Sequence, residues 1–155
     1  MVNMEETELP VRLAGRVIVL DPGDRVLLFW YEGQSGRYWT TPGGGVDPGE
    51  DYHTAAQREI IEETGWTDVP VLPGMVRERL LTMRFGGRDI RQHERYFLAR
   101  VSIDQRPLGD VAAMHLHDGI RGARWWTVAE LDSTNEVVWP EWLAELVKEL
   151  TDDAG

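Results

Sequence analysis

The chain contains no cysteine, which excludes a disulfide framework, a thiolate metal site and a cysteine nucleophile. It also contains no uninterrupted apolar run near the roughly 18 residues that a membrane-spanning helix requires. The first ten residues, "MVNMEETELP", are acidic and have no apolar centre, so we do not expect a signal peptide. These absences predict a cytoplasmic protein with no membrane partner.

Positive charge is scarce as well. Sixteen Lys and Arg residues stand against 27 Asp and Glu residues, which gives a formal net charge of −11. We therefore expect no stable complex with nucleic acid. Phosphate compounds are still candidate substrates, because a bound divalent cation can reverse the sign of the electrostatic potential at an acidic site. The length of 155 residues fits one domain, residues 1–155, in which 1–9 and 151–155 are expected to be flexible tails.

Runs of β-branched and aromatic residues predict strands, and glycine or proline marks the turns between them. The predicted strands cover residues 11–20, 25–31, 37–41, 75–85, 88–103 and 123–127. Hairpin turns are expected at residues 21–24 and at Gly86-Gly87, with loops at 32–36 and 104–122 and a break at "PGGG" (42–45). A first helix is expected to follow Pro48-Gly49 and end at Gly65, and an amphipathic helix is expected over 140–150. The pattern predicts one layered domain of mixed α and β structure.

The first predicted helix carries "QREIIEETG", in which Glu59, Glu62 and Glu63 lie within little more than one turn. At about 100° per residue, Glu59 and Glu63 nearly eclipse each other, and Glu62 lies about 60° to one side of Glu59. Like charges four residues apart cost a helix roughly 0.2–0.5 kcal/mol per pair. Arg58 can pair with Glu62, which leaves the other two glutamates without a partner on the helix.

Two explanations fit this group of charges. Carboxylates that converge from one helix suit Mg²⁺ or Mn²⁺, which are hard cations that prefer oxygen ligands. For the fragment "EIIEE" alone, a solvated acidic face is the simpler explanation. The residues that precede the helix decide between the two.

From Gly44 onward the sequence reads "GGVDPGEDYHTAAQREIIEETGW". Its fixed positions are Gly44, Glu50, the pairs Arg58-Glu59 and Glu62-Glu63, then Gly65 and the apolar Trp66. This segment resembles the Nudix box at every specified position and with the correct spacing over 23 residues. The preceding "YWTTPGG" is also similar to the lead-in of that family.

The resemblance implies a Nudix-type α/β/α sandwich, with a mixed β-sheet and the box helix packed on one face. It implies hydrolysis of a nucleoside diphosphate linked to another group, with Mg²⁺ or Mn²⁺ as cofactor. The implied metal ligands are the Gly44 carbonyl and the carboxylates of Glu50, Glu59, Glu62 and Glu63, with Glu50 reached directly or through water. Arg58 would orient a glutamate, and Glu62 is the favoured one.

One carboxylate must accept a proton from the attacking water. Relatives place this base either on the box helix or on a later loop, so Asp118 in the loop before the last strand is a candidate. Glu94 competes with it. On a strand, Glu94 should point to the same side as Gln92 and Tyr96. The ordinary role for Glu94 is that of a solvent-facing strand residue, and for Asp118 that of a loop aspartate.

Several other side chains have a candidate substrate-binding role and an ordinary structural role. Four arginines on the predicted strands could meet substrate phosphates, although surface pairing is the usual role of such residues: Arg12, Arg16, Arg77 and Arg79. Trp30 and Tyr31 should point to opposite faces of their strand. One of these two, or Trp39, could line a substrate cleft, whereas core packing is the common role of large aromatic residues.

The substrate is not fixed by the sequence. The segment "ERLLTMRF" (78–85) lacks the proline that marks ADP-ribose hydrolases and the tyrosine that marks diadenosine-polyphosphate hydrolases. A coenzyme A signature is not evident, and the lack of cysteine disfavours the isoprenoid isomerase branch. A small MutT-like hydrolase of nucleoside triphosphates, oxidised nucleotides or nucleotide sugars remains.

The alternative function is a non-catalytic nucleotide sensor on the same fold. Relatives often dimerise, so a homodimer stays open.

Overall fold

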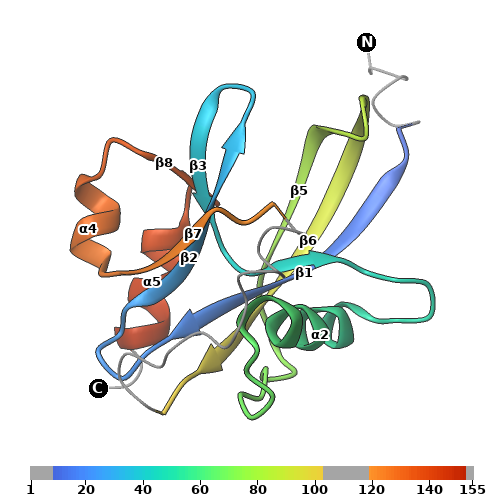
Figure 1. Cartoon of the computed structure of the whole chain (residues 1–155). Coiled ribbons are helices and arrows are strands. Elements are labelled where there is room, and N and C mark those ends of the chain that lie inside the picture. The colour runs from blue at the N-terminus through green and yellow to red at the C-terminus, as the bar shows by residue number, and fades with distance from the viewer. Residues whose placement is uncertain (1–8, 103–118, 153–155) are drawn as a thin grey trace.

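The computed structural model describes residues 9–102 and 119–152, which form one mixed sheet with helices against both faces (Figure 1). The strands are β1 (Val11–Leu20), β2 (Val26–Gly33), β3 (Gly36–Thr40), β4 (Gly43–Gly45), β5 (Met75–Phe85), β6 (Arg88–Arg100), β7 (Gly122–Trp126) and β8 (Val137–Trp139). The helices are α2 (Tyr52–Thr64), α4 (Val128–Ser133) and α5 (Leu143–Asp152). None of the helices in these two ranges is long and apolar enough to span a membrane.

The sheet combines parallel and antiparallel pairs. Its main order is β5-β6-β1-β2-β3-β8, with β4 paired to β1 and β7 paired to β2. The pairs β1–β6 and β3–β8 are parallel, and the other pairs are antiparallel. The β1–β2 register contains a single residue pair, Leu20 with Val26, next to the predicted turn at 21–24. Beyond that pair β1 and β2 diverge, and β4 and β7 pair with the edges that become available.

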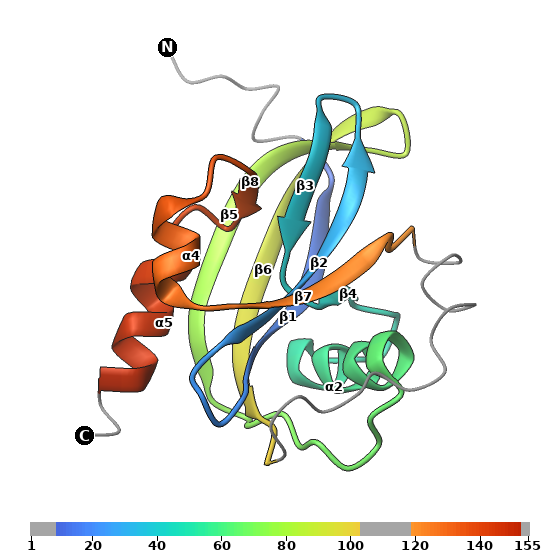
Figure 2. The same cartoon turned by 60° about the vertical axis from the view of Figure 1, so that its left-hand side comes forward.

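Alternating residues of β1 build two hydrophobic cores. Val17 and Val19 pack in the core that contains Ile60 of α2. Ile18 and Leu20 are buried in the other core, which contains Leu143, Leu146 and Val147 of α5. Because successive strand residues point to opposite faces, α2 and α5 cover opposite sides of the sheet, as Figure 2 shows. This arrangement confirms the predicted α/β/α sandwich.

Helix α2 has the ends that its sequence predicts. The side chain of Asp51 caps the helix by accepting a hydrogen bond from the Thr54 backbone N–H at 2.7 Å. Gly65 ends it in the left-handed conformation, at φ 78°. A Cβ atom at Gly15 of β1 would lie 2.3 Å from the Tyr52 carbonyl oxygen, so only glycine allows the first turn of α2 to rest directly on β1.

Several short segments differ from the prediction. Residues 42–45 were expected to interrupt regular secondary structure, but Gly43–Gly45 form β4, whose backbone groups pair with β1. The predicted loop at 32–36 is instead the tight end of a hairpin in which Gly33 pairs with Gly36. The short elements α4 and β8 were not predicted, because a segment of six or three residues carries too little periodicity. Helix α5 includes residues 151–152, which were assigned to a tail. The remaining tail residues 1–8 and 153–155, and most of the predicted 104–122 loop, lie outside the described residues.

Candidate active site

An open pocket of about 680 Å³ lies where β4 meets the box helix α2 and the long strands β1, β5 and β6. Its wall contains both acidic and basic side chains. The lining residues are Arg12, Arg16, Tyr31, Tyr38, Thr40, Gly43, Gly44, Gly45, Glu59, Glu63, Arg79, Leu81, Thr82, Met83, Phe85, Gln92, Glu94 and Trp139. Segments distant in sequence therefore bring residues of the box and three arginines into the lining of one pocket.

Arg58 organises the acidic side of this region. Its Nε and Nη2 atoms donate to the two oxygens of Glu50 at 2.8 and 3.0 Å, and Nη2 also donates to the Gly45 carbonyl at 2.9 Å. Its Nη1 atom donates to Glu59 at 3.1 Å and to Glu62 at 3.2 Å. The predicted contact with Glu62 is present, but Glu59 also has a partner on the helix, so that expectation was wrong. One guanidinium offsets the repulsion among three carboxylates.

These contacts shift the pKa values of Arg58 and Glu50, which are joined by two hydrogen bonds. Hydrogen bonds to Glu50 raise the pKa of Arg58 above its ordinary value, with the charges of Glu59 and Glu50 adding to the effect. The Arg58 hydrogen bond, together with the Asp47 backbone N–H, lowers the pKa of Glu50 below its ordinary value. Both groups are therefore charged at neutral pH, and Arg58 is held in one position.

Glu63 is buried and accepts a hydrogen bond from the backbone N–H of Gly43 at 2.8 Å. Glu63 was expected to have no partner on the helix, and its partner instead comes from β4, 20 residues away along the chain. Helix geometry alone does not predict this contact. Glu63 thereby connects α2 to β4 at the pocket wall.

Glu59 lies against the backbone of Gly44. A Cβ atom at Gly44 would come within 2.4 Å of Glu59 Oε1, so the close approach requires glycine at this position. The Glu59 side chain is 13% exposed, whereas that of Glu62 is 49% exposed and reaches into solvent. The pocket thus presents a carboxylate and a peptide backbone side by side.

These residues fit a hard divalent cation by the chemistry of their donors. All the candidate ligands are carboxylate or carbonyl oxygens, the type that Mg²⁺ and Mn²⁺ prefer. Within the described parts of the chain, no group of three or more His, Cys, Asp or Glu side chains is placed so that it could hold a metal ion. Arg58 Nη1 engages Glu59 and Glu62, and the Gly43 N–H engages Glu63, so these carboxylates are directed at donors of the protein.

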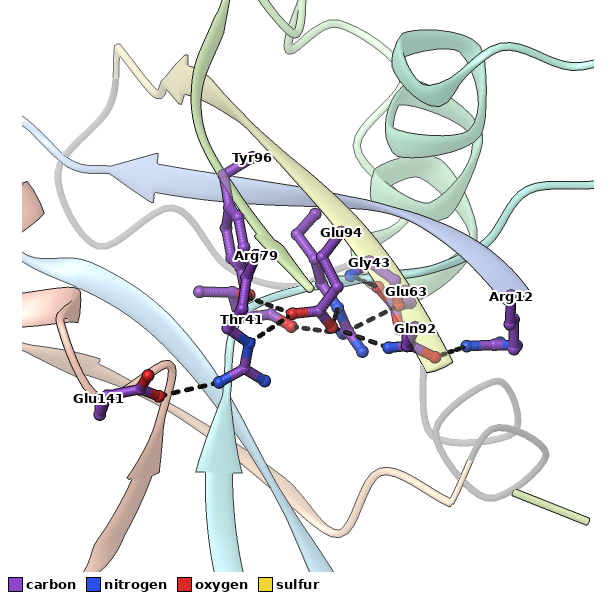
Figure 3. Close-up of polar contacts among 10 residues, drawn as sticks. Arg12, Thr41, Gly43, Glu63, Arg79, Gln92, Glu94, Tyr96 and Glu141 are labelled. Atoms are coloured by element: carbon purple, nitrogen blue, oxygen red, sulfur yellow. Dashed lines mark hydrogen bonds and ion pairs between the residues drawn. The ribbon is translucent and has the colours of Figure 1, made fainter. Parts of the chain in front are cut away.

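Glu94 forms the centre of the basic side, as Figure 3 shows. It is only 2% exposed, so the expectation of a solvent-facing residue was wrong, whereas its predicted orientation with Gln92 and Tyr96 is confirmed. Glu94 Oε1 accepts from Arg79 Nε at 2.9 Å and from the Tyr96 hydroxyl at 2.8 Å. Its Oε2 accepts from Gln92 at 2.8 Å and from Arg16 Nε at 3.3 Å.

The charge of Glu94 is maintained by its neighbours. Burial raises the pKa of this carboxyl, but Arg16 and Arg79 together with two hydrogen bonds outweigh burial and hold it below the ordinary value. Arg16 also donates to the Thr41 and Gly43 carbonyls, at 3.1 and 3.4 Å. Two of the four proposed phosphate-binding arginines therefore line the pocket in fixed positions, and Arg12 lines it as well. Arg77 instead pairs with Glu149 of α5.

Aromatic residues form a further part of the wall. Tyr31 and Tyr38 line the pocket with their rings stacked at 5.4 Å between centroids. Trp30 packs against the core on the α5 side, so Trp30 and Tyr31 do point to opposite faces. Trp39 is a core residue. Phe85 and Trp139, 49% and 42% exposed, complete the aromatic lining.

Sequence reasoning missed part of the site. Gln92, Tyr38 and Phe85 were not singled out as binding residues, and only strand alternation with Glu94 pointed to Gln92. Asp118, the proposed loop base, lies outside the described residues.

The fold and the acidic helix together define a class: a mixed-sheet α/β/α protein with a glycine-containing loop and a glutamate-rich helix at its pocket. The model of the NUDIX domain matches residues 10–150, and this chain belongs to the Nudix family.

Similar proteins include several called RNA pyrophosphohydrolase. That of Pelagibacter ubique is 31% identical over 102 residues, which cover 61% of this chain and 65% of that protein. That of Sphingopyxis alaskensis is 26% identical over 145 residues, which cover 83% of this chain and 85% of that protein. The match thus spans slightly less than two thirds of the length of the first of these relatives.

Solved structures share the fold. The Ap4A hydrolase binary complex of C. elegans has a TM-score of 0.65 at 19% identity and covers 92% of this chain and 97% of that one. The MutT protein of Methanosarcina mazei has a TM-score of 0.66 at 16% identity, and the match covers 95% of this chain and 97% of that one.

Proposed function

We propose that this protein is a divalent-cation-dependent pyrophosphohydrolase that cleaves a nucleoside diphosphate linked to another group by attack of water on phosphorus. The observation that carries the proposal is that one pocket is lined both by Glu59 and Glu63, here called the acidic wall, and by Arg12, Arg16 and Arg79, here called the basic wall. The acidic wall suits a cation, and the basic wall suits phosphate oxygens. The names of the relatives support anhydride cleavage and add the 5′ end of RNA to the candidate substrates.

The cation would be Mg²⁺, with Mn²⁺ as the alternative. Glu59, Glu62, Glu63 and the Gly44 carbonyl would hold it, and Glu50 would assist directly or through water. When bound, such a cation neutralises phosphate oxygens and lowers the pKa of the attacking water.

Arg58 acts as a positioning residue in this proposal. Glu50 and the Gly45 carbonyl fix its Nε and Nη2 atoms, so its Nη1 atom holds Glu59 and Glu62 at one place. The two carboxylates on α2 therefore need little reorganisation of the backbone to serve the reaction.

Proton transfer is assigned to a carboxylate other than Glu94. Four donors engage its two oxygens and its pKa is depressed, which favours a positioning role over that of a base. Glu62 is the half-exposed glutamate of the box, so its carboxylate is accessible to solvent. Asp118 stays a proposed alternative in the later loop.

The nucleoside would lie on the aromatic wall. Tyr31 and Tyr38 present stacked rings, and Phe85 offers an exposed ring at the same pocket. Stacking of a base on an aromatic side chain contributes roughly 1–3 kcal/mol and tolerates different bases.

A substrate panel with Mg²⁺ tests the proposal. It should contain nucleoside triphosphates, oxidised nucleotides, nucleotide sugars and 5′-triphosphorylated RNA, with phosphate and pyrophosphate assayed as products. We expect a nucleoside monophosphate end and a phosphorylated leaving group. Glu62→Gln should reduce kcat by about 100-fold or more, in the range for loss of a group that assists proton transfer. Glu145→Gln, at an exposed glutamate of α5, is the control and should behave as wild type.

Tight nucleotide binding without cation-dependent turnover of any panel member would contradict the enzyme and support the nucleotide sensor. Full turnover in Glu62→Gln would contradict the role of Glu62.

A further inference from the structure

Arg12 differs from the other arginines of the pocket in its partners. Its Nη1 atom donates to the side-chain oxygen of Gln92 at 2.5 Å, and its guanidinium carbon lies 4.3 Å from the centre of the Phe85 ring. Both partners are neutral, and Arg12 forms no ion pair with a carboxylate in residues 9–102 or 119–152. Burial and the like charge of Arg16 lower the pKa of Arg12, against the attraction of Glu59 and Glu94. A partly buried cation is thus held in the pocket without a carboxylate in contact.

Arg16 and Arg79, by contrast, are neutralised. Both bind Glu94, and Arg79 also pairs with Glu141 at 3.0 Å. Carboxylates in contact therefore offset their charges before any ligand arrives, whereas Arg12 has only the longer-range attraction of Glu59 and Glu94. In a chain with a net charge of −11, such a cation in a pocket calls for a ligand of opposite charge.

The orientation of Arg12 is set by a chain of hydrogen bonds, visible in Figure 3. Glu94 is ionised and only accepts hydrogen bonds, so the amide NH₂ of Gln92 must face it. The amide oxygen of Gln92 is consequently turned toward Arg12. Gln92 and Glu94 are each 2% exposed, so this orientation is protected from water. The contact to Gln92 uses one of the five N–H donors of the guanidinium.

Arg12 also lies beside the acidic wall. A Cβ atom at Gly45 would be 2.7 Å from Arg12 Nη2, and the neighbouring Gly44 is the residue against which Glu59 lies. A phosphate that contacts Arg12 would therefore be next to phosphates held at Glu59.

We propose that Arg12 binds a third phosphate of the substrate, and that the substrate is a 5′-triphosphate rather than a nucleotide sugar. This inference rests on the proposed function, because it takes the other two phosphates to lie at the acidic wall. A phosphate oxygen gives Arg12 charge-assisted hydrogen bonds and the missing counter-charge, whereas the hydroxyl groups of a sugar give neither charge nor planar two-point contact. Gln92 and Glu94 act as positioning residues for Arg12.

The experiment compares Arg12→Gln with wild type on matched substrates: GTP, a 5′-triphosphorylated RNA oligonucleotide, and ADP-glucose. We expect wild type to favour a triphosphate over ADP-glucose. Loss of a charge-assisted contact should lower kcat/KM for the triphosphates by about 10- to 100-fold, and that for ADP-glucose by less than about threefold. Arg77→Gln is the control, since it removes one positive charge from the same sheet at a residue that pairs with Glu149 outside the pocket. The GTP and RNA arms distinguish a free nucleotide from an RNA end.

Binding without catalysis gives a second readout. In a chelator and without cation, wild type should bind inorganic triphosphate more tightly than pyrophosphate by calorimetry, and Arg12→Gln should lose that difference while keeping its unfolding midpoint. An equal decrease in kcat/KM for all three substrates, a preference for ADP-glucose, or an unchanged triphosphate preference in Arg12→Gln would overturn the inference. If no substrate is turned over but the Arg12-dependent triphosphate binding is found, the proposed hydrolase fails and the phosphate subsite stands.

Discussion

Gly43 donates its backbone N–H to Glu63 Oε1 at 2.8 Å, and this bond joins strand β4 to the box helix. Glu63 is buried, so the contact is shielded from water. A glutamate of the proposed cation site therefore also supports strand β4, which lines the pocket. Its two roles can be separated by the choice of substitution.

Glu63→Ala should destabilise the protein, because it leaves the buried N–H of Gly43 without its acceptor. We expect a loss of about 1–3 kcal/mol in the free energy of unfolding, measured by urea denaturation. Glu63→Gln keeps an acceptor oxygen and should retain most of the stability, while it weakens the response to Mg²⁺. Equal stability losses in both variants would show that charge, rather than the hydrogen bond, matters at this position.

Addition of Mg²⁺ or Mn²⁺ should raise the thermal unfolding midpoint, because a ligand that binds only the folded state stabilises it. At a cation concentration of 100 times Kd the gain is about 2.7 kcal/mol. Glu59→Ala should reduce this gain, as Glu59 lies against the Gly44 backbone in the pocket. Glu145→Ala, on the exposed face of α5, should respond as wild type does. A cation response that is unchanged in Glu59→Ala would exclude Glu59 as a ligand.

The layered fold was predictable because its signals are local. Strand patterns, the Gly86-Gly87 turn and the helix end at Gly65 depend on a few neighbouring residues. Strand β4 escaped prediction because three glycines carry no side-chain pattern, and their pairing depends on the distant strand β1. Local sequence contains no information on that partner.

The site was predictable to the extent that its residues fall in one contiguous motif. The box motif identified Glu50, Arg58 and the glutamates of the helix. Helix geometry alone does not predict that Arg58 forms two hydrogen bonds with Glu50, which is eight residues away. Glu94 was misjudged for a related reason. Its burial results from Arg16 of β1 and Arg79 of β5, which the sheet topology brings to β6.

Gly44→Ala should impair the cation site without unfolding the protein. The new methyl group would have to displace Glu59 Oε1, which would lie only 2.4 Å away. We expect the Mg²⁺-induced rise in the unfolding midpoint to shrink and the activity to fall, while the midpoint without cation changes little. Gly74→Ala is a matched control, because a Cβ atom there meets nothing within 4 Å. A normal Mg²⁺ response in Gly44→Ala would show that the approach of Glu59 to the backbone is not needed for cation binding.

Glu94→Gln should destabilise the protein strongly at neutral pH. The substitution leaves Arg16 and Arg79 without the buried carboxylate that both bind, and a broken buried ion pair costs roughly 3–5 kcal/mol. Glu141→Gln removes the exposed partner of the same Arg79, and its carboxylate is 61% exposed. That control should cost no more than about 1 kcal/mol. Similar losses in the two variants would contradict the importance of burial.

The same glutamate should contribute to acid sensitivity. The pKa of Glu94 in the folded protein is below its ordinary value of 4.5, so its stabilising effect is complete above that value. The effect is lost as the pH falls through the lower, folded-state pKa, because protonation breaks the pairs with Arg16 and Arg79. Urea titrations from pH 7 to 3 should show that wild type loses more stability than Glu94→Gln below about pH 4.5. Parallel curves for the two proteins would mean that other carboxylates govern the acid response.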